Sequence, residues 1–235
     1  MNYFAHGRAF VDDPFFLAGT ALPDWMNVVD RRNRVRSRAA LPWVDDDDRY
    51  LARLAAGVVR HHADDAWFHE TAAFTELSLA FTVLVRDQLP GDEGFRPHFL
   101  GHILVEILLD ATLIAGAPGH LEAYYSAVDR IDGEAACRAV ERFAPRPVPE
   151  LPNFIRLFSR ERFLWDYLDD GKLLFRLNQV MRRVGLPSLP PEFVVVLPEM
   201  RQTVTARQTD LLTPREIETN RHLKTVDPQK QHSDL

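Results

Sequence analysis

Apolar residues recur at intervals of three and four along most of the chain after residue 48, the spacing of helices with one buried face. Proline and glycine punctuate this pattern. The predicted helices are 49–62, 66–88, one opened by Pro97, 119–131, 134–143, 153–168 and 171–184. Only 194–196, VVV, is strand-like, and Pro198 close behind it argues against a strand. The pattern therefore predicts an all-α fold.

The expected organisation is a single-domain helical bundle over residues 1–212 with a polar tail at 213–235. Segment 144–152, APRPVPELP, is a linker by composition, although helices on both sides of it could share one core. The tail has no apolar period and ends in KTVDPQKQHSDL. Such a composition is typical of disorder.

The composition narrows the function classes. A hydrophobic content of 46% in 235 residues supports a real core, and a net charge of −6 argues against general nucleic-acid binding. The single cysteine, Cys137, excludes an intrachain disulfide framework and a multi-thiolate metal site. No basic segment followed by an apolar run opens the chain, so no signal peptide and a cytoplasmic location are expected.

Two charged stretches need an interpretation. The apolar stretch 99–116 carries His102, Glu106 and Asp110, which a lipid bilayer would bury at high cost, so a core helix is predicted rather than a transmembrane one. Segment 30–38, DRRNRVRSR, is either an exposed basic loop or a docking patch for an acidic partner or a phosphate. The candidate partner-binding residues in it are Arg31, Arg32 and Arg34.

Histidines and carboxylates alternate at helical spacing in HHADDAWFH, residues 61–69. His61 and Asp65 are four residues apart, as are Asp65 and His69, so each pair shares one helix face. A single pair of this kind is more often a surface or capping interaction than a metal site. A second series on another helix makes a metal site the favoured interpretation.

The second series, His102, Glu106 and Asp110, lies in the otherwise apolar stretch HILVEILLD. Charges there are costly unless they are paired or bind a cation. Two helices presenting imidazole and carboxylate inward can build a metal site in a bundle, and His6 and Asp24 could add ligands. The predicted cofactor is a divalent ion, with Mn favoured over Zn, Fe or Mg. A hydrogen-bonded network without metal is the alternative.

Several motifs occur in an order that is informative. The chain opens with MNYFAH and continues with FLAGTALPDW, AAGVVRHHADD, HILVEILLD and FLWDYLDDGKLLFRLNQVMRR. Over residues 1–185 this series resembles the acyl carrier protein phosphodiesterase family. Gly19, Asp24, Gly57 and His61 match positions of that family's motifs.

The resemblance implies a helical fold related to metal-dependent phosphohydrolases of the His-Asp type. It also implies removal of phosphopantetheine from an acidic carrier protein, or hydrolysis of a related small phosphodiester. His61 and Asp65 would be the core metal ligands, with His6 and Asp24 nearby. The metal would polarise the phosphoryl oxygen and lower the pKa of a bound water. The candidate catalytic residues are Asp65, His69 and Glu106.

The chain also departs from the family's pattern. His62, a further candidate for substrate binding, stands where the family has arginine, and His69 stands where it has aspartate. Glu106 and Ile107 replace an Asp-His pair. The later His–x₃–Glu spacing resembles that of zinc-dependent phospholipases C and nucleases. A zinc-dependent phospholipase C-like hydrolase is therefore the alternative enzyme. A non-catalytic helical binding or scaffold protein is the third hypothesis.

Overall fold

The computed structural model describes residues 1–89, 91 and 94–213. These residues form helices and contain no β-strand, so the predicted all-α class is confirmed. The α-helices are α1 (Tyr3–Gly7), α2 (Pro14–Val29), α3 (Ser37–Ala40), α4 (Arg49–His69), α5 (Ala72–Gln88), α6 (Pro97–Gly116), α7 (Pro118–Asp129), α8 (Gly133–Val140), α9 (Leu151–Glu161), α10 (Asp170–Arg183), α11 (Leu197–Ala206) and α12 (Gln208–Leu212). Short 3₁₀ helices are η1 (Arg8–Phe10), η2 (Leu41–Trp43), η3 (Phe163–Leu168) and η4 (Pro191–Val196).

The predicted helix boundaries were wrong at two places. The helix expected over 66–88 begins at Ala72, because the Thr71 side chain caps it, and α4 runs on to His69. The helix expected over 153–168 ends at Glu161, because Arg162 adopts a left-handed backbone conformation with φ of 46°. The valine run at 194–196 belongs to a 3₁₀ helix.

Helix α2 was not predicted, and it is central to the site. Pro23 lies inside it, and a proline within a helix removes one backbone hydrogen bond. The helix packs tightly along α4. A Cβ at Gly19 would lie 2.2 Å from the Leu54 carbonyl oxygen, and Gly19 and Gly57 face each other across the contact. Only glycine at both positions permits this approach of the two backbones.

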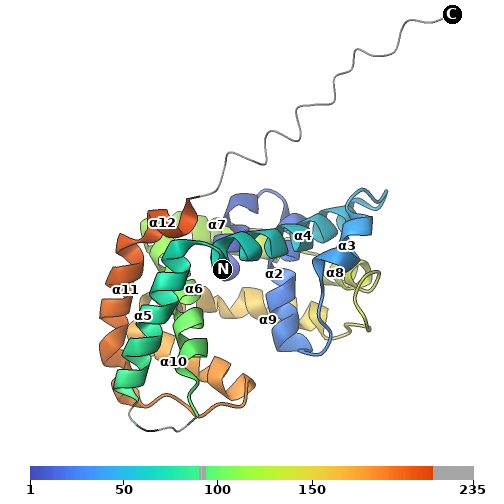
Figure 1. Ribbon diagram of the computed structural model, residues 1–235. Coiled ribbons are helices and arrows are strands. Elements are labelled where there is room, and N and C mark those ends of the chain that lie inside the picture. Colours follow the sequence, from blue (N-terminus) through green and yellow to red (C-terminus); the bar gives the residue numbers. More distant parts are fainter. Residues whose placement is uncertain (90, 92–93, 214–235) are drawn as a thin grey trace, which may run out of the picture.

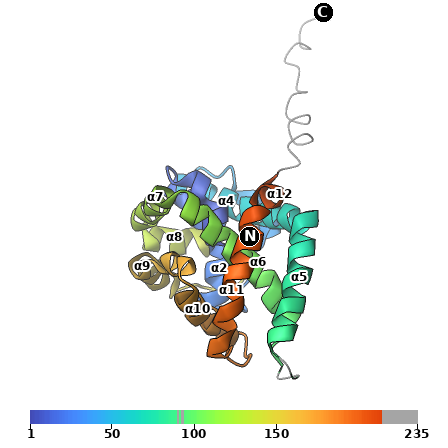
Figure 2. The ribbon, with the colours of Figure 1, turned by 90° about the vertical axis from the view of Figure 1, so that its left-hand side faces the viewer.

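Helix α6 runs through the middle of the molecule and contacts α1, α5, α7, α11 and η3 (Figures 1 and 2). By length and composition it could cross a membrane, but 67% of its apolar window is buried inside the protein, as in a core helix. The N-terminus lies among the helices close to α4 and α6 in both views. The site is therefore assembled around α6.

One hydrophobic cluster includes residues from Met1 to Leu211. Val148 and Leu151 of the proline-rich segment 144–152 belong to it, so the helices on both sides of that segment share a core. Cys137, the single cysteine, is a buried free thiol. The predicted polar tail lies, from residue 214 onwards, outside the described residues.

Candidate metal centre

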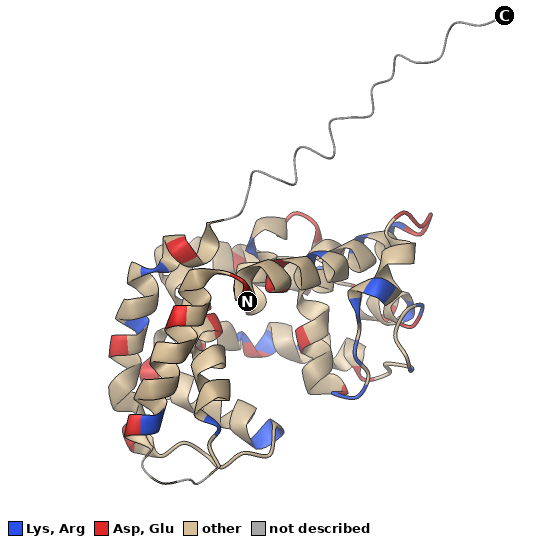
Figure 3. Cartoon of the chain, in the orientation of Figure 1, with Lys and Arg blue, Asp and Glu red and all other residues tan. Residues whose placement is uncertain are grey.

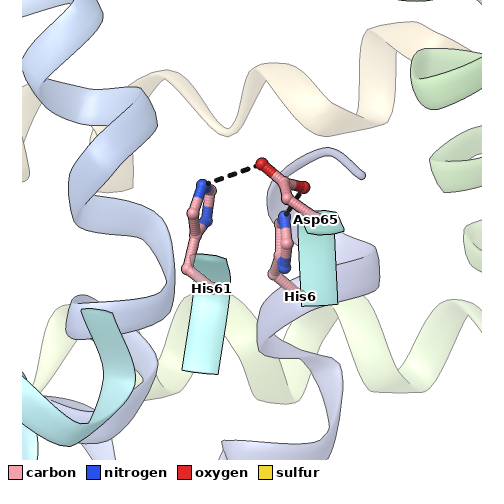
Figure 4. A group of neighbouring side chains, drawn as sticks. All are labelled: His6, His61 and Asp65. Atoms are coloured by element: carbon pink, nitrogen blue, oxygen red, sulfur yellow. Dashed lines mark hydrogen bonds and ion pairs between the residues drawn. The ribbon is translucent and has the colours of Figure 1, made fainter. Parts of the chain in front are cut away.

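His6, His61 and Asp65 form a compact group, here called the first trio. His6 Nε2 lies 3.1 Å from Asp65 Oδ1, and His61 Nε2 lies 3.3 Å from Asp65 Oδ2. Figure 4 shows the two imidazoles side by side with the carboxylate above both of them. Their ring centroids are 4.2 Å apart, and both histidine side chains are buried. Because two stacked imidazolium rings would repel each other, the arrangement disfavours protonation of both rings at once.

The orientation of His61 is set by α2. Its Nδ1–H donates to the Thr20 carbonyl oxygen over 2.8 Å, a contact that the Gly19–Gly57 approach makes possible. A neutral His61 therefore has its lone pair on Nε2, directed at the Asp65 carboxylate. Two electron-rich atoms face each other unless a proton or a cation lies between them. A backbone acceptor on the far ring nitrogen is the usual support of a metal-binding histidine.

His6 is positioned by Asp110. Both carboxylate oxygens of Asp110 accept backbone N–H groups at the start of α1, from Phe4 at 2.9 Å and Ala5 at 2.8 Å. Asp110 is fully buried, and its burial raises its pKa to about 7. It was predicted as a ligand, but it lies outside the groups that could hold an ion. Its contacts instead hold the helix that carries His6.

His69, His102 and Glu106 form a second trio at the other end of the same site. His69 Nε2 lies 2.9 Å and His102 Nε2 lies 3.2 Å from the same oxygen, Glu106 Oε1. Because α4 extends to His69, Asp65 and His69 share that helix but belong to different trios. In each trio the ligand atoms lie within 4.8 Å of one another.

The amino group of Met1 connects the two trios. Its nitrogen lies 2.8 Å from Asp65 Oδ1 and 3.2 Å from Glu106 Oε1. Three nitrogens thus converge on Glu106 Oε1: the Met1 ammonium and one imidazole nitrogen each from His69 and His102. The positively charged ammonium therefore lies between the two carboxylates and pairs with both.

The neighbouring nitrogens also decide the ionisation state of the Asp65 and Glu106 carboxylates. Burial disfavours the charged form of Asp65, but His6, His61 and the Met1 ammonium hold its pKa well below the usual range. Burial opposes the charged form of Glu106 as well, and the Met1 ammonium with His102 and His69 depresses its pKa. Both groups therefore stay ionised and available as ligands at neutral pH.

The donor sets fit a divalent ion. Each trio offers two imidazole nitrogens and one carboxylate, a mixture that suits Mn, Fe or Zn better than Ca. His6 also carries a buried Nδ1 without a hydrogen-bond partner, 3.7 Å from the Asp64 carboxylate. Although burial disfavours its charged form, Asp64 and Asp65 raise the pKa of His6 to about 9, so a metal ion would have to displace a proton from this ring. Three protein ligands leave coordination positions open for water or substrate.

A cavity of about 330 Å³ opens beside the trios. Asp24 and Glu106 line it, so it reaches the second trio directly. Among the described residues no hydrogen bond or ion pair involves the Asp24 carboxylate, and burial raises its pKa. Most of the remaining wall is aromatic or aliphatic: Tyr3, Val28, Phe99, Ile103, Ile107, Phe154, Phe163, Tyr167, Val180 and Val184.

Only some of the residues predicted to bind a substrate or partner line this cavity. Arg31 and Arg34 line it, whereas Arg32 does not. His62 also lies outside the lining; its Nε2 contacts the Val35 carbonyl oxygen at 3.0 Å and so anchors the basic loop. Figure 3, in which every described Lys and Arg is blue, shows blue segments along the loop between α2 and α3. Two arginines of α10 complete the lining, Arg176 and Arg183, which the sequence reasoning missed.

Comparisons with known proteins assign this chain to no family. No family model, no curated protein and no solved structure matches this chain. The function must therefore be argued from the two trios and the cavity.

Proposed function

We propose that this protein is a metal-dependent phosphodiester hydrolase with a bundle of the His-Asp phosphohydrolase type. The observation that carries the proposal is the pair of histidine–carboxylate trios next to a cavity lined by arginines. Such a cavity can hold an anionic substrate, and the trios could hold a metal ion that polarises the phosphoryl oxygen and activates the water that attacks phosphorus. A divalent ion, Mn first, supplies Lewis acidity and a water of lowered pKa.

The residues of the chain then have separate roles. His6, His61 and Asp65 would hold one ion, and His69, His102 and Glu106 would hold a second, so each carboxylate would serve one centre. The Met1 ammonium lies between Asp65 and Glu106 and would have to move aside for a substrate to bind in that space. A phosphodiester bound there would be oriented by both sites.

Asp24 is placed to move a proton. It lines the cavity beside Glu106, and burial raises its pKa, so it holds a proton more readily than an exposed aspartate. A protonated carboxyl at that position can donate to the oxygen of the leaving alcohol, as general acids with raised pKa values do. Asp24 is thus assigned to proton transfer rather than to metal binding.

The cavity wall bears on the choice of substrate. Its aromatic and aliphatic residues favour a diester that carries an apolar group, which supports the phospholipase C-like alternative. Its arginines equally suit the acidic carrier protein implied by the resemblance. Direct assay of a phosphopantetheinyl protein and a phospholipid separates these substrates.

The test is metal content followed by activity. Purified wild-type protein is analysed for Mn, Fe and Zn and compared with His61→Ala and His102→Ala, which each remove a ligand of one trio. We expect each variant to lose one ion while its helical circular dichroism is retained. His98→Ala is the matched control, because His98 is exposed on α6 one turn before His102.

Three outcomes decide the proposal. Loss of metal in both ligand variants, together with metal-dependent hydrolysis of bis(4-nitrophenyl) phosphate, supports it. Equal loss in His98→Ala would show that the variants act through folding and not through ligation. Absence of metal in the wild-type protein after incubation with each ion would overturn it and leave the histidines as a structural network.

A further inference from the structure

The cavity beside the trios is long enough to hold more than the reacting phosphate. Along α6 its wall runs from Glu106 back to Phe99, seven residues or about 10 Å of helix. Along α10 it runs from Arg176 to Arg183, again about 10 Å. A substrate that reacts at Glu106 can therefore extend well beyond the trios within the same cavity.

Three arginines of this lining, Arg31, Arg34 and Arg183, have no acidic partner in the part of the chain that the structure describes. Among the described residues no ion pair involves the side chain of Arg31, Arg34 or Arg183. Arg176 provides the contrast, because Asp166 neutralises it at 2.6 Å. The cavity is thus lined by guanidinium groups whose charge no carboxylate among the described residues neutralises.

These arginines come from two distant parts of the chain. Arg31 and Arg34 follow the C-terminal end of α2, and Arg183 ends α10. The loop that carries the first two is held in place by buried Asn33, whose side-chain amide donates to the Arg146 carbonyl oxygen at 2.9 Å and whose oxygen accepts from the Arg146 N–H at 3.2 Å. Their convergence on one cavity is therefore a property of the fold and not of a flexible tail.

We propose that Arg31, Arg34 and Arg183 form a subsite for a second anionic group of the substrate. The substrate class is then an amphipathic phosphodiester: a scissile phosphate at the trios, an apolar spacer against Phe99 and Phe163, and a phosphate or carboxylate at the arginines. Guanidinium groups are suited to both anions because they donate two parallel hydrogen bonds. The scissile end rests on the proposed function, whereas the arginine subsite can be tested without turnover.

The first test measures binding. Hexyl phosphate is titrated calorimetrically into the full-length protein, as purified and again with chelator present. We expect binding to persist with chelator and to weaken about tenfold in Arg34→Gln and in Arg183→Gln, as the loss of one charge-assisted hydrogen bond predicts. Arg32→Gln is the matched control, since Arg32 is exposed in the same loop but does not line the cavity.

Two results of this titration would overturn the subsite. One is unchanged affinity in both cavity variants. The other is an equal loss in Arg32→Gln, which would reduce the effect to the general charge of the loop.

The second test measures specificity. Two 4-nitrophenyl phosphodiesters are compared, one with a hexyl chain and one with the same chain ending in a carboxylate. We expect kcat/KM to favour the carboxylated diester about tenfold in wild type and in Arg32→Gln, and the ratio to approach one in Arg34→Gln and Arg183→Gln. A wild-type ratio near one would contradict the subsite. Absence of hydrolysis of either diester would count against the proposed function alone, and the titration would still decide the subsite.

Discussion

The contact between α2 and α4 gives a sharp prediction for Gly57→Ala. A Cβ at position 57 would lie 2.2 Å from the Phe16 carbonyl oxygen, 2.8 Å from Gly19 Cα and 2.9 Å from the Thr20 nitrogen. All three atoms are backbone, so no side-chain rotation relieves the collision. The helices must separate by about 1 Å to reach ordinary van der Waals contact.

The separation has two measurable consequences. Overpacking of this kind costs about 3 kcal/mol, the upper part of the usual range, because no flexible group can yield. In a protein of this size that cost lowers Tm by about 10 °C. The same movement stretches the 2.8 Å hydrogen bond from His61 Nδ1 to the Thr20 carbonyl oxygen. Loss of such support for a metal-binding histidine weakens metal affinity about 10–100-fold.

Thermal unfolding and metal titration of Gly57→Ala test this reasoning. Gly119→Ala is the control, because a Cβ at that position meets nothing within 4 Å. We expect the control to keep the wild-type Tm to within about 2 °C, as exposed substitutions do. A Gly57→Ala protein with the stability and metal affinity of the control would refute the claim that this glycine contact builds the site.

Further predictions concern three buried groups. Burial raises the pKa of Asp110 to about 7, so the folded state binds its proton more tightly than the unfolded state, and its contribution to stability declines as pH rises from about 4 to 7. Urea unfolding of Asp110→Asn should lack this decline; an identical pH dependence in both proteins would exclude Asp110 as its source. Asn33→Ala should weaken hexyl phosphate binding and cost about 2 kcal/mol of stability without changing metal content, because the basic loop loses both contacts to Arg146. Burial raises the pKa of the Cys137 thiol, so a thiol reagent should modify it slowly in the folded protein and rapidly in urea; equal rates would show that it is accessible.

The helices with a clear apolar period could be predicted from the sequence. Helix α2 could not, because Pro23 interrupts its pattern and its apolar residues are spread around the helix. The boundary between α4 and α5 was misplaced because the apolar spacing continues through Thr71, whereas the Thr71 side chain stops one helix and caps the next. Helical period is a weak signal where a cap decides the boundary.

The sequence by itself determined the helical class and the pairing of histidine with carboxylate four residues away, because that spacing is local and any α-helix brings such residues onto one face. Only the tertiary structure decided which pairs meet. It placed His6 beside His61 and His69 beside His102. It also directed the Asp110 carboxylate to backbone N–H groups of α1. Finally, it brought Arg183 to the same cavity as arginines of the basic loop. These contacts depend on how closely helices cross, and that distance is decided by packing between residues far apart in the chain.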